Sequence, residues 1–136
     1  MKVLFFAGFG PIIKDSNTSE SLYLDTLGLS FEREGDYLYT AKLAGVKHFA
    51  LCPLSQAAES CFGTKEWSKD FPVPQSWIEF DVEDISEATR ELEEKGYKLL
   101  VSARKEPWGQ IVTRFLSPEG MLVGVTYTPG MREQKK

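Results

Sequence analysis

The order of apolar and polar residues predicts a strand, a helix and further strands in the first part of the chain. An apolar run over residues 3–13 predicts the opening strand. Polar cap candidates at residues 14–17 precede Leu22, Tyr23 and Leu27 at helical spacing, and Gly28 follows, where helices commonly end. Later strand-like runs are found at residues 37–41 and 46–51.

The second part of the chain repeats this order. Apolar and polar residues alternate along residues 77–83, as they do in a half-buried strand. Asp84 is a candidate cap, Ile85, Ala88 and Leu92 form a helical stripe, and Gly96 follows it. Further strand-like runs are found at residues 97–102, 111–116 and 122–128.

The two halves align with a nearly constant offset, which predicts a duplicated module. Asp84 lies 69 residues after Asp15, and Gly96 lies 68 residues after Gly28, half the chain length of 136. We therefore predict an α+β fold of two tandem βαβββ modules whose curved mixed sheets enclose a cleft, with the helices on the outer face. The expected boundaries are 1–52 for the first module, 53–75 for a linker with a short helix, 76–130 for the second module and 131–136 for a frayed tail.

The alternation in residues 77–83 assigns side chains to the two faces of one strand. If Ile78 and Phe80 pack against a helix, then Trp77, Glu79 and Asp81 face the other way, toward the cleft. A simply solvated sheet face is the equal alternative. The pattern leaves open whether the modules pair within one chain or across a dimer.

Composition narrows the range of partners. The net charge of −4 and the pI near 5.1 argue against nucleic acid, which requires clustered Lys and Arg. No apolar stretch approaches the length of a membrane span, and residues 1–13 are better explained as a first strand than as a secretory leader. Cys52 and Cys61 fit reduced thiols, so we expect a cytoplasmic protein.

Three phrases in order resemble the vicinal oxygen chelate superfamily, which includes glyoxalases, bleomycin-resistance proteins and extradiol dioxygenases. Residues 15–29 are similar to its passage from an Asp to Leu-Gly-Leu, and residues 77–84 to its second-module strand. Residues 108–120, with Trp-Gly and then Phe-Leu-Ser-Pro-Glu-Gly, are similar to its last passage. The resemblance covers essentially the whole chain and implies the fold predicted above.

The same resemblance implies where metal ligands would lie, and the chain departs from it. Three of the four ligand positions fall on Gly8, Trp77 and Gly124, and only His48 lies near the fourth. A divalent metal is therefore possible but disfavoured, and no cofactor is expected. Glu119, within Ser-Pro-Glu-Gly, fits an exposed turn residue.

His48, the only histidine, is either a hydrogen-bonded structural residue or a ligand or base facing the cleft. A nucleophilic pair with Cys52 is not expected, because four residues of straight strand separate the two by roughly 13 Å. Glu79 and Asp81, if enclosed, would attract a cation or act in proton transfer.

Aromatic residues are the other candidates for a binding surface. Trp77, Trp108 and Tyr39 can each stack on a planar or cationic ligand, although tryptophan more often packs in a core. Trp77 is of special interest because it stands at an expected metal-ligand position.

We therefore predict a binding protein that holds a small aromatic or cationic molecule without a metal. A glyoxalase-type lyase or isomerase, or a dioxygenase-like enzyme, using His48 and Glu79 is the alternative, with or without a divalent metal. A module whose sheet face contacts another protein is a third possibility. The resemblance further implies a homodimer.

Overall fold

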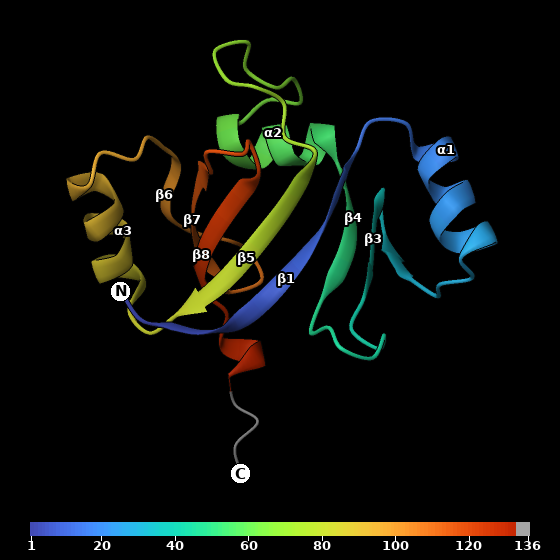
Figure 1. The fold of residues 1–136 in the computed structure, drawn as a ribbon, viewed down its shortest axis with the longest axis horizontal. Coiled ribbons are helices and arrows are strands. Elements are labelled where there is room, and N and C mark those ends of the chain that lie inside the picture. Colours follow the sequence, from blue (N-terminus) through green and yellow to red (C-terminus); the bar gives the residue numbers. More distant parts are fainter. Residues whose placement is uncertain (133–136) are drawn as a thin grey trace.

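The computed structural model describes residues 1–132, which fold around one open, curved sheet of eight strands (Figure 1). The elements in chain order are β1 (Val3–Ile13), α1 (Ser16–Glu20), the π-helical turn η1 (Ser21–Thr26), β2 (Glu32–Glu34), β3 (Tyr37–Thr40), β4 (Phe49–Pro53), α2 (Leu54–Phe62), β5 (Ser76–Val82), α3 (Ile85–Glu94), β6 (Leu99–Lys105), β7 (Ile111–Leu116), β8 (Leu122–Tyr127) and the 3₁₀ turn η2 (Pro129–Met131).

The strand order β2-β3-β4-β1-β5-β8-β7-β6 confirms two tandem modules of one fold. In each module the first strand pairs in parallel with the last, β1 with β4 and β5 with β8. The first strands of the two modules, β1 and β5, pair antiparallel with each other at the centre of the sheet. The two modules therefore join within a single chain.

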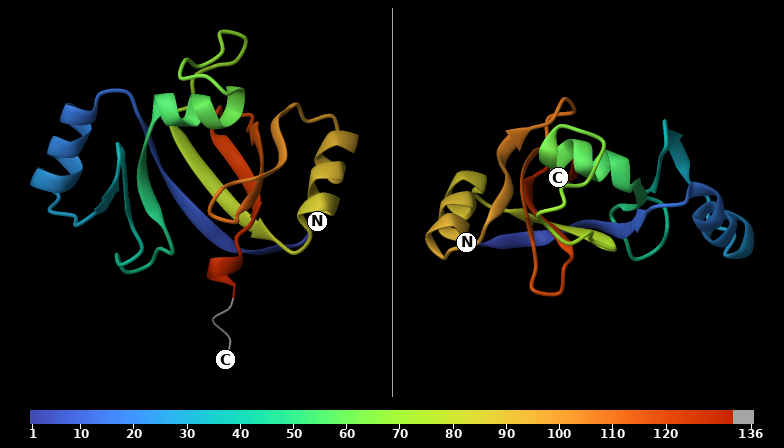
Figure 2. Two further views of the ribbon diagram at one scale, coloured as in Figure 1. Left: turned by 180° about the vertical axis from the view of Figure 1, so that it is seen from behind. Right: turned by 90° about the horizontal axis from the view of Figure 1, so that it is seen from above.

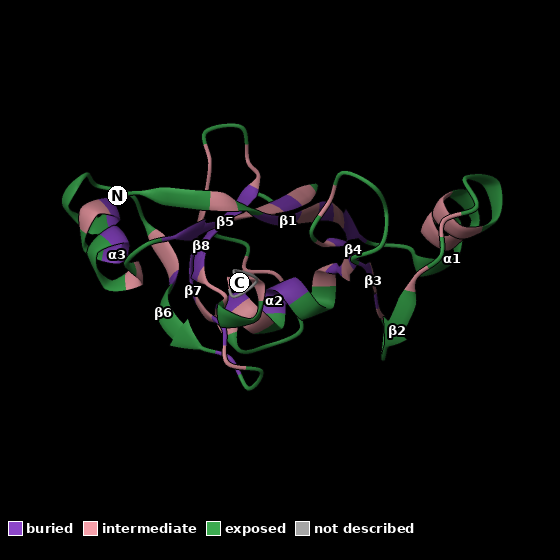
Figure 3. Cartoon of the chain, turned by 90° about the horizontal axis from the view of Figure 1, so that it is seen from below, coloured by how far each residue is buried: buried purple, intermediate pink, exposed green. Residues whose placement is uncertain are grey.

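The helices lie on different sides of the curved sheet. The two module helices, α1 and α3, lie at its opposite ends, as Figure 2 shows from behind and from above. The linker helix α2 lies on the inner side, between the two halves of the sheet (Figure 3). The sequence predicted a short helix in the linker, and α2 begins there at Leu54, directly after Pro53.

Three apolar clusters stabilise this arrangement. One joins α2 to the inner sheet face and includes Ala57, Cys61 and Trp77. A second packs η1 on the first module, around Phe49, and the third packs α3 on the second module, around Val82. Each helix thus covers a patch of sheet that would otherwise expose apolar surface to water.

The first helix begins as predicted but buries a different face. Asp15 caps it, because its carboxylate accepts the backbone N–H groups of Asn17 and Thr18. The helix then widens into the π-helical turn, which shifts the phase of the later side chains. Of the predicted stripe, Tyr23 packs on the core, whereas Leu22 and Leu27 are 47 % and 56 % exposed. Leu24, which was not predicted, packs on the core beside Tyr23.

The strand that closes the first module starts later than predicted. It begins at Phe49 instead of residue 46, so His48 lies just before the strand. The structure also contains β2, which the sequence pattern did not predict, because its three residues are all charged and all exposed.

The two edges of the open sheet differ in construction. On one edge, β2 is a short exposed strand of Glu32, Arg33 and Glu34. On the other edge, the pairing of β6 with β7 shifts register between Val101 and Arg104, and Ala103 adopts a positive φ of 45° there.

Residues 131 and 132, the first two of the predicted frayed tail, have a defined structure. Met131 ends η2, and Arg132 donates from Nε to the carboxylate of Asp81 over 2.7 Å. This ion pair anchors residues 131 and 132, and residues 133–136 lie outside the described residues. Among residues 1–132, no helix is long and apolar enough to cross a membrane.

Candidate functional site

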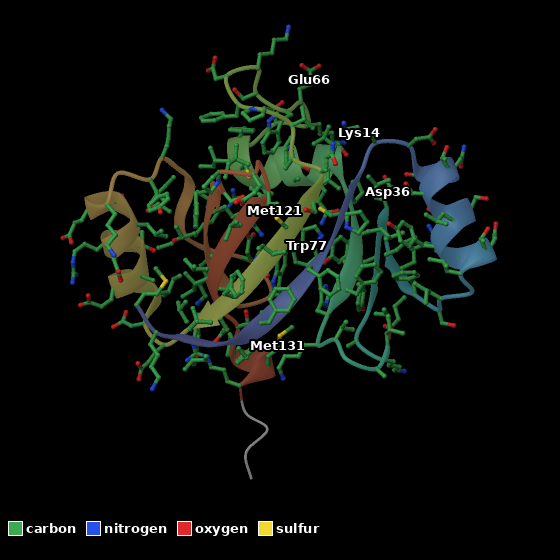
Figure 4. The ribbon with its side chains drawn as sticks, in the orientation of Figure 1. Lys14, Asp36, Glu66, Trp77, Met121 and Met131 are labelled. Carbon is green, nitrogen blue, oxygen red and sulfur yellow. The ribbon has the colours of Figure 1, made fainter. Side chains whose placement is uncertain are left out.

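A cavity of about 670 Å³ lies on the inner side of the curved sheet, within the size range of small-molecule sites. Side chains from both modules and from α2 line it, so one chain supplies all of its walls. In Figure 4, Trp77 lies near the centre of the molecule and Met131 toward the C-terminal end; both line this cavity.

The first module supplies an aromatic wall, which consists of Tyr37, Tyr39 and His48. The rings of Tyr39 and His48 are nearly parallel, with centroids 5.5 Å apart and an interplanar angle of 15°. Tyr37 completes a triangle with them, 5.9 Å from Tyr39 and 6.1 Å from His48. Three aromatic rings therefore line this side of the cavity.

A hydrogen bond fixes the orientation of this wall. The hydroxyl of Tyr37 lies 2.8 Å from Nε2 of His48. Burial lowers the pKa of His48, and the negative charge of Glu79 opposes this only in part, so the imidazole is neutral at pH 7. Burial also raises the pKa of Tyr37, which keeps its phenol protonated. A neutral imidazole and a neutral phenol thus meet at the wall.

Trp77 belongs to both the core and the cavity. It is 7 % exposed, and its indole N–H donates to the carbonyl of Ala50 over 3.3 Å. Its ring also fills the space beside Gly8, where an added Cβ would lie 3.1 Å from the indole carbon Cη2. Trp77 therefore supports the aromatic wall more than it offers a free stacking face.

The second module supplies a buried polar cluster, which consists of Glu79, Glu106, Gln110 and Arg114. Arg114 donates to Oε2 of Glu79 over 3.3 Å, and its Nη1 lies 3.7 Å from Oε2 of Glu106. Gln110 donates to the other oxygen of Glu79 over 3.1 Å. The side chain of Arg114 is 13 % exposed, that of Glu79 15 % and that of Glu106 7 %.

The turn between β6 and β7 brings Glu106 and Trp108 to the cavity. The backbone N–H of Gly109 donates to the carbonyl of Glu106, with a positive φ of 97° at Gly109 that favours glycine. Trp108, 67 % exposed at the rim, donates from its indole to the side-chain oxygen of Gln110 over 3.1 Å. This bond links the rim tryptophan to the buried cluster.

Asp81 does not join the other predicted residues in the cavity. It is fully buried and accepts hydrogen bonds from the backbone N–H of Thr128, over 2.7 Å, and from the hydroxyl of Thr126. With its ion pair to Arg132, the carboxylate is saturated. The alternation of the strand placed it on the inner face, but the C-terminal segment covers that end of the strand.

The glycines at the expected metal-ligand positions give space to neighbouring side chains. A Cβ at Gly124 would lie 3.1 Å from Cγ of Glu79, as one at Gly8 would meet Trp77. His48 engages Tyr37 through Nε2. Within the described part of the chain, no group of three or more His, Cys, Asp or Glu side chains is placed to hold a metal together. These residues do not fit the metal site of the fold family.

The two cysteines are thiols of low reactivity, Cys61 buried and Cys52 half-buried. Burial raises the pKa of Cys52 to about 12 and that of Cys61 to about 11. Both are free. Cys52 lines the cavity, and a protonated thiol there adds to its apolar surface.

Of the predicted site residues, Tyr39, His48, Trp77, Glu79 and Trp108 lie in the cavity lining. Sequence reasoning missed three polar residues that lie beside them. These are Glu106, Gln110 and Arg114. Arg114 carried a usable signal, because a lone arginine within the apolar strand 111–116 is a candidate for a buried ion pair.

Comparison with known proteins identifies the family of the chain. Residues 12–125 match the family described as Glyoxalase/Bleomycin resistance protein/Dioxygenase superfamily. The chain therefore belongs to this superfamily, and its resemblance to the vicinal oxygen chelate proteins is confirmed at the level of family and fold. No curated protein sequence matches the chain.

Solved structures share the fold at low sequence identity. A glyoxalase/bleomycin resistance protein/dioxygenase superfamily member from Vibrio splendidus 12B01 is 19 % identical, with a TM-score of 0.61, over 88 % of this chain and 96 % of that one. A structure titled NAD-dependent benzaldehyde dehydrogenase from Legionella pneumophila is 12 % identical (TM-score 0.58), with the same coverage of 88 % and 96 %. A methylmalonyl-CoA epimerase from Streptomyces coelicolor is 15 % identical (TM-score 0.55), over 94 % and 96 %. At such identities these likenesses show the fold alone.

Proposed function

We propose that this protein is a binding protein that holds a small aromatic or cationic molecule in the cavity without a metal. The observation that carries the proposal is the cavity of about 670 Å³ with one wall of nearly parallel rings. Apolar pockets with a few convergent polar groups are the usual form of small-molecule sites. Gly8, Trp77 and Gly124 at the ligand positions favour a metal-free site.

Titration of a panel of aromatic compounds, followed by tryptophan fluorescence, tests this proposal. Tyr39→Ala removes a ring from the wall and is expected to weaken binding about three- to tenfold, the usual contribution of one aromatic contact. Tyr97→Ala is the matched control, because Tyr97 is 45 % exposed and lies outside the cavity lining. If no aromatic compound binds, or if both variants bind equally to the wild type, the cavity is not the binding site.

A proton-transfer enzyme of glyoxalase type is the second candidate, since His48 is held neutral and could accept a proton. Glu79 is less suited to the role of a base, because Arg114 and Gln110 both engage its carboxylate. Turnover of an aldehyde, hemithioacetal or catechol that is lost in His48→Gln would favour the enzyme over the binding protein.

The expected homodimer and cytoplasmic location belong to the same proposal. The chain exposes 8043 Å², whereas a compact monomer of 15.4 kDa exposes about 7,200 Å². Part of the surplus is apolar surface at the start of β1, where Leu4 is 40 % and Phe6 45 % exposed. Light scattering coupled to size-exclusion chromatography gives the mass in solution and tests the dimer.

A further inference from the structure

We propose that the polar cluster around Glu106 is a subsite for a cationic N–H group, such as an amidinium or guanidinium, carried by a flat ligand. This inference rests on the proposed function, because it assigns a chemical class to the ligand of the same cavity. Three independent observations support it: the charge of the cluster, an oxygen without a donor and the shape of the opposite wall.

The charge of the cluster is unbalanced. Glu79 and Glu106 share one cation, Arg114, and all three side chains are at most 15 % exposed. The remaining charged residues of the cavity lining do not correct this, because Glu34 and Glu59 outweigh Arg104. A buried carboxylate in excess of its cations is unfavourable and favours entry of a second positive charge.

One oxygen of the cluster lacks a donor. Among the buried side-chain oxygens and nitrogens of residues 1–132, Oε2 of Glu106 is the one without a hydrogen-bond partner. Arg114 reaches this oxygen only as an ion pair, with Nη1 3.7 Å away, because its guanidinium donates to the hydroxyl of Ser60, over 2.5 Å, and to Glu79. Buried carboxylate oxygens are nearly always paired, so a group that enters the cavity and meets the Glu106 carboxylate gains a strong acceptor.

The opposite wall selects a flat ligand. Tyr39 and His48 contribute nearly parallel rings to the cavity lining, and Trp108 adds an exposed indole at the rim. A ring that stacks on this wall can direct an attached cationic group toward the second module. Planar N–H donors suit the site better than a metal ion, which would require several converging oxygen or nitrogen ligands besides Glu79 and Glu106.

Three probes of nearly equal shape and different charge test the inference: benzamidine, benzamide and benzoate. Isothermal titration calorimetry measures each on the wild-type protein, which requires no variant. Benzamidine is expected to bind at least about tenfold more tightly than benzamide, and benzoate more weakly than both, because a hydrogen bond to a charged group contributes about ten- to hundredfold in affinity.

Glu106→Gln then removes the charge while keeping the size of the side chain. We expect it to weaken benzamidine about ten- to hundredfold and to leave benzamide unchanged. Glu59→Gln is the matched control, because Glu59 lines the same cavity but is exposed, and it should change either affinity less than about threefold.

A stability measurement separates a binding role of Glu106 from a structural one. Because two carboxylates share one arginine, Glu106→Gln is expected to keep or raise the melting temperature. A fall of more than about 5 °C would make Glu106 a structural partner of Arg114 and would overturn the inference.

The outcomes distinguish this inference from the proposed function. Equal binding of benzamidine and benzamide, unaffected by Glu106→Gln, would overturn the cationic subsite and leave an aromatic-binding cavity. Binding of none of the three probes, together with none of the wider aromatic panel, would overturn the proposed function and the inference with it.

Discussion

Adding a single methyl group at two glycines of β1 tests how closely the sheet and the aromatic wall are packed. At Gly10 a Cβ would lie 1.8 Å from the carbonyl oxygen of Ala50, which belongs to the backbone of β4. At Gly8 it would lie 3.1 Å from Cη2 of Trp77 and 3.2 Å from the carbonyl oxygen of His48. The first contact is impossible without separating β1 from β4, whereas the second requires shifts of a few tenths of an ångström.

The expected magnitudes follow from these distances. Gly10→Ala should prevent folding. Overpacking in Gly8→Ala should lower the free energy of unfolding by about 1–3 kcal/mol. Loss of the conformational freedom of a strand glycine should raise the same free energy by about 0.5–1 kcal/mol. The net loss of about 1–2 kcal/mol corresponds to a melting temperature about 3–8 °C lower for a chain of this length.

Thermal denaturation followed by circular dichroism measures these differences. Gly130→Ala is the control, because nothing lies within 4 Å of a Cβ at that position, and its melting temperature should match that of the wild type. The reasoning would be refuted if Gly10→Ala were as stable as Gly130→Ala, since β1 and β4 could not then be in register at that distance.

Two further predictions concern protonation. Because the pKa of His48 is lowered from 6.5 in the folded protein, the unfolded chain binds the proton more readily. The free energy of unfolding should therefore stay constant above about pH 6.5 and decline as pH falls through the lowered pKa. The slope of this decline is at most about 1.4 kcal/mol per pH unit. Urea denaturation between about pH 8 and pH 5 should show a smaller decline for His48→Gln, and identical declines would contradict the burial effect. The raised pKa values of Cys52 and Cys61 predict that both thiols are labelled at pH 8 at least about a hundredfold more slowly in the folded than in the denatured protein. Rapid labelling of either thiol without denaturant would contradict this prediction.

Much of the fold was predictable because local periodicity determines where its strands lie. The predicted strands at 3–13 and 111–116 agree with β1 and β7 residue for residue. The three charged residues of β2 show no alternation of apolar and polar residues, so this strand was not predicted. The π-helical turn η1 was not predicted either, because it depends on tertiary packing and not on the local sequence pattern.

The candidate site was predictable only in part, for a related reason. The alternation of β5 correctly placed Trp77 and Glu79 on the inner face, because the two sides of a strand follow from sequence position alone. Glu106 and Arg114 meet Glu79 through a hairpin turn and through strand pairings across the sheet. Such contacts between residues far apart in the chain depend on the curvature of the sheet, which cannot be predicted from a single sequence.

The two edges of the open sheet have a consequence for the molecule at high concentration. An edge strand exposes backbone donors and acceptors that can recruit a strand from another molecule and begin a fibril. Here Glu32, Arg33 and Glu34 form an edge too short and too charged to serve as a template. At the opposite edge, the register shift and the positive φ of Ala103 interrupt the regular ladder. The protein can thus keep its sheet open around a cavity and still resist growth by strand addition at either end.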